Sequence, residues 1–200
     1  DSNNAQQFYD AGLNITLPRN VKFGDIGTND EMFFSYGLDE LMDMEEHGVK
    51  LPKKVLIDIA NGHMRKLYDF SKHLKDKYGD DLTLMIGNIA NPETYRMYCN
   101  IGVDYIRVNI GTGASCTSSA TTGIHYPPAS LISECSVIEK GLNNPDKIID
   151  DGGFKKFPDI IKALALGADY VMIGSLLAKS RESCGKKYYK LESDDSYISI

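Results

Sequence analysis

The chain has 200 residues, of which 42% are hydrophobic and 25% are charged, and this fits one globular domain with a sizeable core. The formal net charge of −6 supplies no basic surface for a phosphate backbone and argues against nucleic acid as a general partner. No run reaches the ~20 apolar residues of a membrane helix, and residues 1–20 lack the cationic start and apolar centre of a signal peptide. We therefore expect a cytoplasmic protein with no membrane partner.

In chain order, one pattern repeats: a short apolar strand ends in polar residues, and an amphipathic helix follows. Seven strands are predicted, at residues 13–17, 21–26, 51–60, 81–90, 104–111, 145–153 and 168–178. Helices are predicted at residues 31–46, 64–78, 93–102 and 158–167. Asn91 and Pro92 are placed as the cap and the first residue of the third of these helices.

Parallel strands joined by helical crossovers form either a doubly wound sheet or a closed barrel. Polar or glycine-rich residues follow nearly every strand, and a barrel gathers all strand ends on one face, whereas an open sheet uses one or two. We predict an α/β fold, a (β/α)8 TIM barrel, with residues 1–200 as a single catalytic domain. Because a barrel has eight strands, we expect the first strand, and part of the region around residues 184–200, to be absent from this sequence.

The stretch 109–135 reads NIGTGASCTSSATTGIHYPPASLISEC and joins an apolar strand to a loop that carries a thiol. Gly111 and Gly113 let the backbone approach a ligand, and Cys116 follows where a strand-end loop would present it. Cys116 is therefore predicted to be a nucleophile. The four cysteines show neither a C-x-x-C pair nor a zinc spacing, and Cys99 and Cys135 are expected to be buried small residues of helices.

The last two strand ends predict a phosphate site. Glycine amides and the start of a short helix bind an anion without a lysine, and the ends of the last two barrel strands often do so. The residues in these positions are Gly152, Gly153, Gly174 and Ser175. Asp151 could then accept hydrogen bonds from a ribose diol beside the phosphate, so the predicted ligand is a nucleotide.

Several motifs resemble one known family. They are KFGDIGTND, LIDIANGH, MIGNIA, IGTGASCTSSATTGIHYP, IIDDGGF and GADYVMIGSLLA. On these the chain resembles the IMP dehydrogenase and GMP reductase family over essentially its whole length. The segments ANGH and CTSSATTGIHYP are more similar to GMP reductase, whereas GSLLA is similar to the dehydrogenase.

This resemblance implies roles for individual residues. It assigns catalytic roles to Cys116 and Ser118. Substrate binding is assigned to Asn88, Asp151, Gly152, Gly153, Gly174 and Ser175, and cofactor binding to Asp58, Asn61 and Gly62. Cys116 would attack C2 of the purine of GMP or IMP and form a covalent adduct. A monovalent cation such as K⁺, held by the backbone carbonyls of Gly111, Gly113 and Cys116, is a further expectation, as is a homotetramer.

Three function classes stay open. The resemblance favours NADPH-dependent reductive deamination of GMP to IMP, with NAD-dependent oxidation of IMP to XMP as the alternative. A phosphate-binding aldolase or isomerase would need a lysine or a carboxylate base at a strand end, and no lysine occupies such a place. A catalytically weak nucleotide-binding relative is the third class, because Ala114 stands where the family has a serine and the residues after GKKY do not match.

Overall fold

The computed structural model describes residues 2–24, 29–112, 121, 123, 125–141, 147–178, 180, 182–183, 188–190 and 197–199. Within these ranges, no helix has the length and apolar character needed to cross a membrane.

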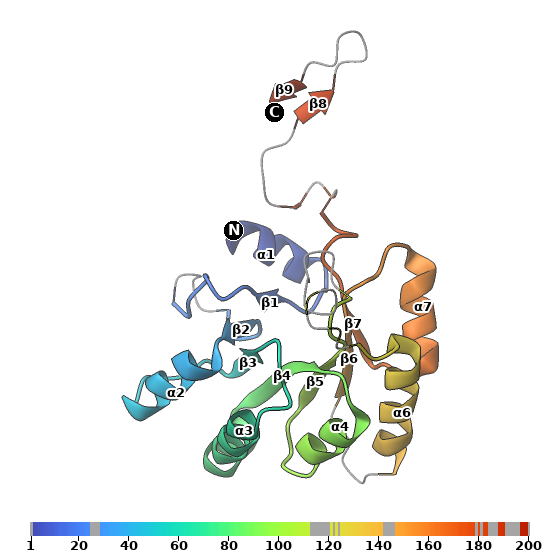
Figure 1. Ribbon diagram of the computed structural model, residues 1–200. Helices are drawn as coiled ribbons and strands as arrows, with labels where there is room; N and C mark the ends of the chain where they lie inside the picture. Colours follow the sequence, from blue (N-terminus) through green and yellow to red (C-terminus); the bar gives the residue numbers. More distant parts are fainter. Residues whose placement is uncertain are drawn as a thin grey trace.

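A seven-stranded parallel sheet forms the centre of the molecule, and each strand pairs with the next one in the chain (Figure 1). Its strands are β1 (Thr16–Leu17), β2 (Phe33–Tyr36), β3 (Lys54–Asp58), β4 (Thr83–Ile89), β5 (Tyr105–Val108), β6 (Lys147–Asp151) and β7 (Tyr170–Met172). Two further strands, β8 (Tyr188–Lys190) and β9 (Tyr197–Ser199), form an antiparallel pair of their own.

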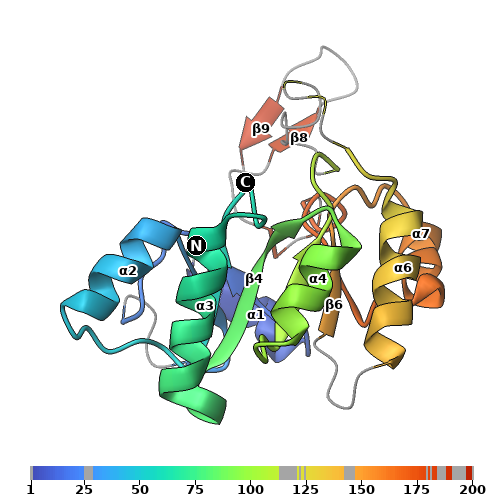
Figure 2. The ribbon, with the colours of Figure 1, turned by 60° about the horizontal axis from the view of Figure 1, so that its bottom comes forward.

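Helices follow most of the strands and cover one face of the curled sheet. They are α2 (Leu38–Glu46), α3 (Arg65–Tyr78), α4 (Pro92–Cys99), α6 (Pro128–Lys140) and α7 (Phe157–Leu166), with the short 3-10 helix η1 (Gly79–Asp81) after α3. Figure 2 shows the five α-helices side by side in chain order. Strands in sequential parallel order with their helices outside are the arrangement of a TIM barrel, so the predicted fold is confirmed.

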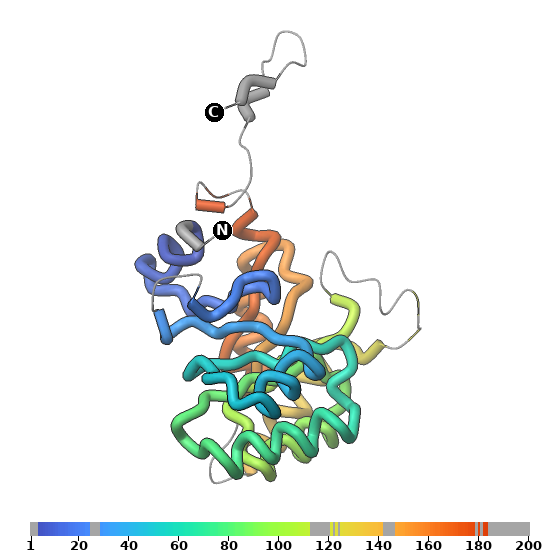
Figure 3. The backbone as a smooth tube through the Cα atoms, turned by 90° about the vertical axis from the view of Figure 1, so that its left-hand side faces the viewer, coloured from blue at the N-terminus to red at the C-terminus, as the bar shows by residue number. Residues whose placement is uncertain are grey.

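The N-terminal helix α1 (Ser2–Asp10) lies beside the segment that follows β7 (Figures 1 and 3). The side chain of Asn4 donates a hydrogen bond to the backbone carbonyl of Glu182. The segment that precedes β1 is thus in contact with the segment that follows β7.

One predicted strand is wrong, and of the helix predicted at residues 31–46 only the part from Leu38 to Glu46 is helical, as α2. Residues 21–24 hold a single bridge residue, Phe23, instead of a strand, and the second strand is β2, inside the stretch that was predicted as helix 31–46. All four residues of β2 are buried. A strand buried on both faces reads as an unbroken apolar run instead of an alternating one, and here it merges with the apolar residues of α2.

Alternate residues of the strands divide the core into two layers. Phe33, Leu56, Met85 and Ile149 pack together on the concave face, while most other buried residues lie between the sheet and the helices. Because side chains alternate along a strand, the residues two positions later occupy the same concave face at the carboxyl end. On β3, β5 and β6 these residues are Asp58, Arg107 and Asp151. A polar layer therefore lies directly above the apolar one.

Gly87 makes room for this polar layer. It pairs with Arg107 in the β4–β5 register, and a Cβ at Gly87 would lie 2.5 Å from Cβ of Arg107.

The helix α4, which follows β4, begins as predicted. The side chain of Asn91 accepts hydrogen bonds from the backbone N–H groups of Glu93 and Thr94, and Pro92 is the first residue of the helix.

Candidate functional site

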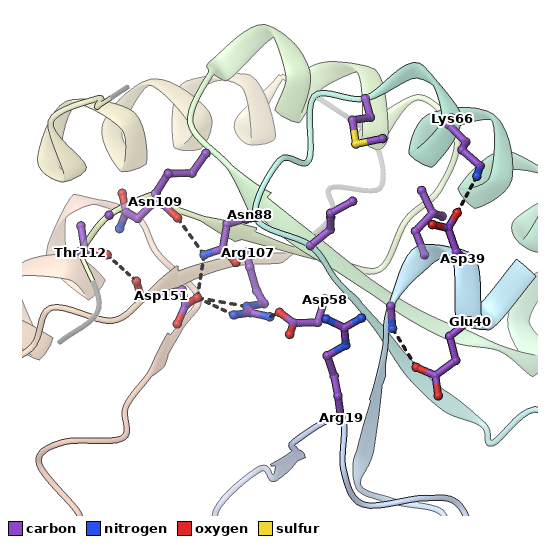
Figure 4. A pocket seen from close by; sticks show the side chains of 17 residues that line it. Arg19, Asp39, Glu40, Asp58, Lys66, Asn88, Arg107, Asn109, Thr112 and Asp151 are labelled. Carbon is purple, nitrogen blue, oxygen red and sulfur yellow. Dashed lines mark hydrogen bonds and ion pairs between the residues drawn. The ribbon is translucent and has the colours of Figure 1, made fainter. Parts of the chain in front are cut away.

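A cavity of about 640 Å³ opens at the carboxyl ends of the strands. Its lining includes Asp58 of β3, Asn88 of β4, Arg107 of β5 and Asp151 of β6, together with residues of the following loops (Figure 4). A cavity of this size can hold a small-molecule ligand, and in barrels the active site is found at this end.

Arg107 ties two carboxylates together at the floor of the cavity. Its Nη1 lies 2.8 Å from Oδ1 of Asp58, and its Nη2 lies 2.7 Å from Oδ2 of Asp151. The side chain of Arg107 is 11% exposed and that of Asp151 is 17% exposed. Burial acts to lower the pKa of Arg107, but the two carboxylates outweigh burial and raise it. The guanidinium therefore stays charged and holds both acids in fixed positions.

Asp151 is held by residues at the ends of two other strands, β4 and β5. Nδ2 of Asn88 donates to its Oδ2 at 2.7 Å, and Oγ1 of Thr112 donates to its backbone carbonyl at 2.8 Å. Asn88 also donates to the backbone carbonyl of Asn109 at 2.8 Å. Within the part of the chain that the structure describes, these side-chain bonds leave Oδ1 of Asp151 to accept from a ligand.

The residues predicted for a phosphate lie at the ends of the adjacent strands β6 and β7. Gly152 and Gly153 have φ angles of 81° and 84°, where a side chain would be strained, and a Cβ at Gly153 would lie 3.2 Å from Thr112. Gly174 faces open space, since no atom lies within 4 Å of an added Cβ. Oγ of Ser175 donates to the backbone carbonyl of Phe154 at 3.5 Å and brings the two loops together.

Of the residues predicted for the cofactor, Asp58 lines the cavity, whereas Asn61 and Gly62 are not among its lining residues. Asn61 is exposed and accepts a hydrogen bond from the backbone of His63. Gly62 is buried, its carbonyl accepts from the hydroxyl of Tyr98 at 2.8 Å, and an added Cβ would lie 2.6 Å from the carbonyl oxygen of Asn88. In this structure Gly62 supports the strand end that carries Asn88.

Cys116, Ser118 and Gly113 lie outside the described residues. Gly111 is described, lines the cavity and has a φ of 85°. Cys135 is buried, as predicted, and burial with a smaller effect of Cys99 raises its pKa to about 12. The thiol of Cys135 is therefore neutral and unreactive. Cys99, which was also predicted to be buried, is only half-buried.

Several lining residues were missed from the sequence, among them Arg19, Lys66, Arg107, Asn109 and Thr112. One signal was present for Arg107: in YIRV the charged residue shares its face with Tyr105, while Ile106 and Val108 form the apolar face. A charge inside a strand buried on both faces indicates a partner on the neighbouring strands.

Comparison with known proteins places these features in one family. The family model described as "IMP dehydrogenase / GMP reductase domain" matches residues 37–197. The chain is 40% identical over 131 residues to the inosine-5'-monophosphate dehydrogenase of Staphylococcus aureus and 38% identical over the same length to that of Staphylococcus epidermidis. Each alignment covers 66% of this chain and 26% of the relative, so the aligned part is about a quarter of these proteins.

A solved structure shows the same architecture over the whole chain. The inosine 5' monophosphate dehydrogenase of Legionella pneumophila superposes with a TM-score of 0.78 at 29% sequence identity. The match covers 100% of this chain and 61% of that one.

Proposed function

The chain belongs to the IMP dehydrogenase / GMP reductase family, and from this membership we propose that it is an oxidoreductase that oxidises IMP at C2 of the purine ring. The reported relatives and the structural neighbour, all inosine monophosphate dehydrogenases by name, support this direction of the reaction. The proposed cofactor is NAD.

The position of Asp151 carries the proposal. Arg107 and Asn88 hold one of its carboxylate oxygens, and the other can accept hydrogen bonds from a ribose diol. The backbone amides near Gly153 and Gly174 lie at the ends of β6 and β7, where an anion needs no lysine. A ribose 5'-phosphate fits this arrangement, because its diol and its phosphate would meet different groups.

The proposed chemistry begins at the thiol of Cys116. As a thiolate it would attack C2 of the bound purine, and water would later hydrolyse the adduct at the same carbon to give XMP and the free thiol. When bound, the nicotinamide cofactor would accept the hydride that leaves C2. Ser118, two residues after the thiol, is proposed to donate a hydrogen bond to the reacting groups, and K⁺ would bind the carbonyls of Gly111, Gly113 and Cys116.

The cavity fits such a cofactor. Its lining includes the acids Asp39 and Asp58 and the cations Arg19 and Lys66, so acceptors for a diol and cations for a phosphate are both present. Lys66 pairs with Asp39 at 2.6 Å. Arg107 holds Asp58 in place, and a fixed carboxylate accepts from a ribose hydroxyl without having to be ordered first.

A second candidate is NADPH-dependent reduction of GMP to IMP with loss of ammonia. The loop CTSSATTGIHYP favours it, because this loop is of the reductase kind and contains no arginine that could activate a water. Both candidates share Cys116 and Asp151.

Two assays on one preparation test the proposal: NADH formation from IMP with NAD, and loss of NADPH with GMP. Sustained NADH formation that Cys116→Ala abolishes would support the dehydrogenase. Loss of NADPH that depends on GMP would transfer the assignment to the reductase. Nucleotide binding in calorimetry with neither reaction would contradict both and leave a nucleotide-binding relative without catalysis.

A further inference from the structure

Asn109 and Asp150 are two polar side chains buried at neighbouring strand ends, and the function proposed above uses neither of them. Asn109 follows β5 and is 1% exposed, and Asp150 is in β6 and is 4% exposed. Nδ2 of Asn109 donates a hydrogen bond to Oδ1 of Asp150. Oδ1 of Asn109 is buried and, within the described part of the chain, has no hydrogen-bond partner. A buried acceptor without a donor is costly, so a donor is to be expected there.

Among the described residues, no cation pairs with Asp150. Its neighbour Asp151 carries a second carboxylate, and Arg107 is turned toward Asp151 and Asp58. Burial, and then the charge of Asp151, raise the pKa of Asp150 to about 7.

The helices beside β6 bring no counter-charge either. Cys135 on α6 is a neutral thiol, and Glu139 pairs with Lys147 at the opposite end of β6. On α7 the side chains of Asp159 and Lys162 pair with each other. Within the described residues, the carboxyl of Asp150 therefore has an amide partner and a like-charged neighbour only.

Asn109 lies seven residues before Cys116, directly after β5, and its backbone is held on both sides. Its φ is 88°, a conformation that asparagine tolerates better than most residues. Its N–H donates to the carbonyl of Ile89 at 2.9 Å, and its carbonyl accepts from Asn88 at 2.8 Å. Three residues later, Thr112 binds the carbonyl of Asp151. The segment 109–112 is thus held to β4 and β6 by hydrogen bonds, a few residues before Cys116 in the chain.

We propose that Asp150 is a neutral carboxylic acid that forms a two-bond pair with the amide of Asn109, and that this pair positions the segment 109–112, which precedes Cys116 in the chain. The amide N–H donates to one carboxyl oxygen, and the O–H on the other donates to Oδ1 of Asn109. One proton then provides the missing donor and removes a buried charge beside Asp151.

The consequence for the site rests on the function proposed above. When Asp150 loses its proton, Asn109 loses one of the two bonds and Asp151 gains a like charge next to it. With a pKa of about 7, the protonated fraction falls from about 0.9 at pH 6 to about 0.1 at pH 8. If only the protonated form of Asp150 holds the segment 109–112 in the geometry that binds IMP, the affinity for IMP falls by up to about ninefold over this pH range.

Asp150→Asn is the matched variant. An asparagine at this position donates permanently to Oδ1 of Asn109 and accepts from its Nδ2, so both bonds persist without a titrating proton. Asp159→Asn changes a partly exposed acid on α7, which pairs with Lys162, and serves as the control. In calorimetry with IMP, we expect the wild-type protein and Asp159→Asn to lose affinity between pH 6 and 8 more steeply than Asp150→Asn. Equal pH dependence in all three proteins would overturn the positioning role.

Infrared spectroscopy tests the pair without any nucleotide. The wild-type protein should show the carbonyl band of a protonated carboxylic acid at pH 6 that disappears near pH 7 to 8 and is missing in Asp150→Asn. Absence of the band from the folded wild-type protein at pH 6 would refute the proposal whatever the enzyme does, and it needs no variant to fold. Presence of the band without IMP binding would uphold the pair and refute the proposed function alone.

Discussion

The guanidinium of Arg107 lies 2.7 Å from the carboxylate of Asp151. The two residues are 44 positions apart in the chain and come from the neighbouring strands β5 and β6. The same guanidinium reaches Asp58, so one cation serves two acids at the mouth of the barrel. This bridge decides where the carboxylate proposed for the ribose points.

Replacing Arg107 with alanine should destabilise the protein strongly. The bridge is mostly buried, and removal of one partner leaves two carboxylates without their cation, which costs about 3–5 kcal/mol for a buried pair. Arg65→Ala is the matched control, because Arg65 pairs with Asp69 on the surface of α3, and an exposed pair of this kind contributes little to stability. Urea unfolding measures both, and equal losses would contradict a structural role of the bridge.

Gly87→Ala should disturb the same bridge, because the new methyl group would displace Arg107. Its φ is 150°, and the new Cβ would meet Cβ of Arg107 at 2.5 Å, so backbone strain and overpacking add up to about 2–5 kcal/mol. Gly102→Ala has a positive φ of 73° without any atom within 4 Å and should cost only the strain of about 1–2 kcal/mol. A smaller loss of stability in Gly87→Ala than in Gly102→Ala would be inconsistent with this close contact.

Thiol reagents should modify Cys116 and spare Cys135. Cys135 is buried with a raised pKa and stays a neutral thiol, whereas Cys116 is the proposed nucleophile. Mass spectrometry after brief alkylation of the folded protein locates the label, and IMP should protect Cys116 from it. Cys116→Ala should abolish turnover and keep nucleotide binding, and more than a few per cent of residual rate would exclude a covalent mechanism through this residue.

Asp151→Ala should weaken IMP or GMP by about tenfold or more, because charge-assisted hydrogen bonds to a diol contribute roughly 1.5–3 kcal/mol. Part of the effect would come from Arg107 and Asn88, which lose their common acceptor. Asp159→Ala on α7 controls for the loss of an acidic residue that does not line the cavity. Titration calorimetry gives the affinities, and an unchanged affinity would remove Asp151 from the binding site.

Stability should depend on pH through Asp150. Its pKa is raised from 3.8 to about 7 by folding, so the folded protein holds this proton more tightly than the unfolded chain. The resulting stability is present in full at low pH and is lost as pH rises from about 4 through about 7, an effect on the order of 2–4 kcal/mol. Asp150→Asn should lack this loss and be the more stable protein at pH 8. Denaturant unfolding at pH 5 and pH 8 measures it, and parallel changes in the two proteins would exclude the shift.

From the sequence alone, the repeated strand and helix pattern determined the fold class and six of the seven strands, β1 and β3 to β7, because each is an apolar run that stops at proline, polar or glycine residues. It also predicted the cap of α4 at Asn91 and the candidate residue Asp151 from local signals, whereas Asp58 and Asn88 were predicted through the family resemblance of their motifs. It misplaced β2, because burial on both faces removes the alternation by which a strand is recognised.

Only the tertiary structure decided which polar side chains meet. Arg107 is a lone charge in an apolar strand when the chain is read in order, and its partners Asp58 and Asp151 lie 49 and 44 positions away. The parallel register brings Arg107 opposite Gly87, with β3 and β6 placing their carboxylates on the same concave face. Likewise, the pairing of Asn109 with Asp150 depends on the positive φ of Asn109, which turns a residue of one strand end toward the next strand. Such contacts arise from strand register and side-chain direction, which are properties of the assembled sheet, and no local pattern of residues encodes them.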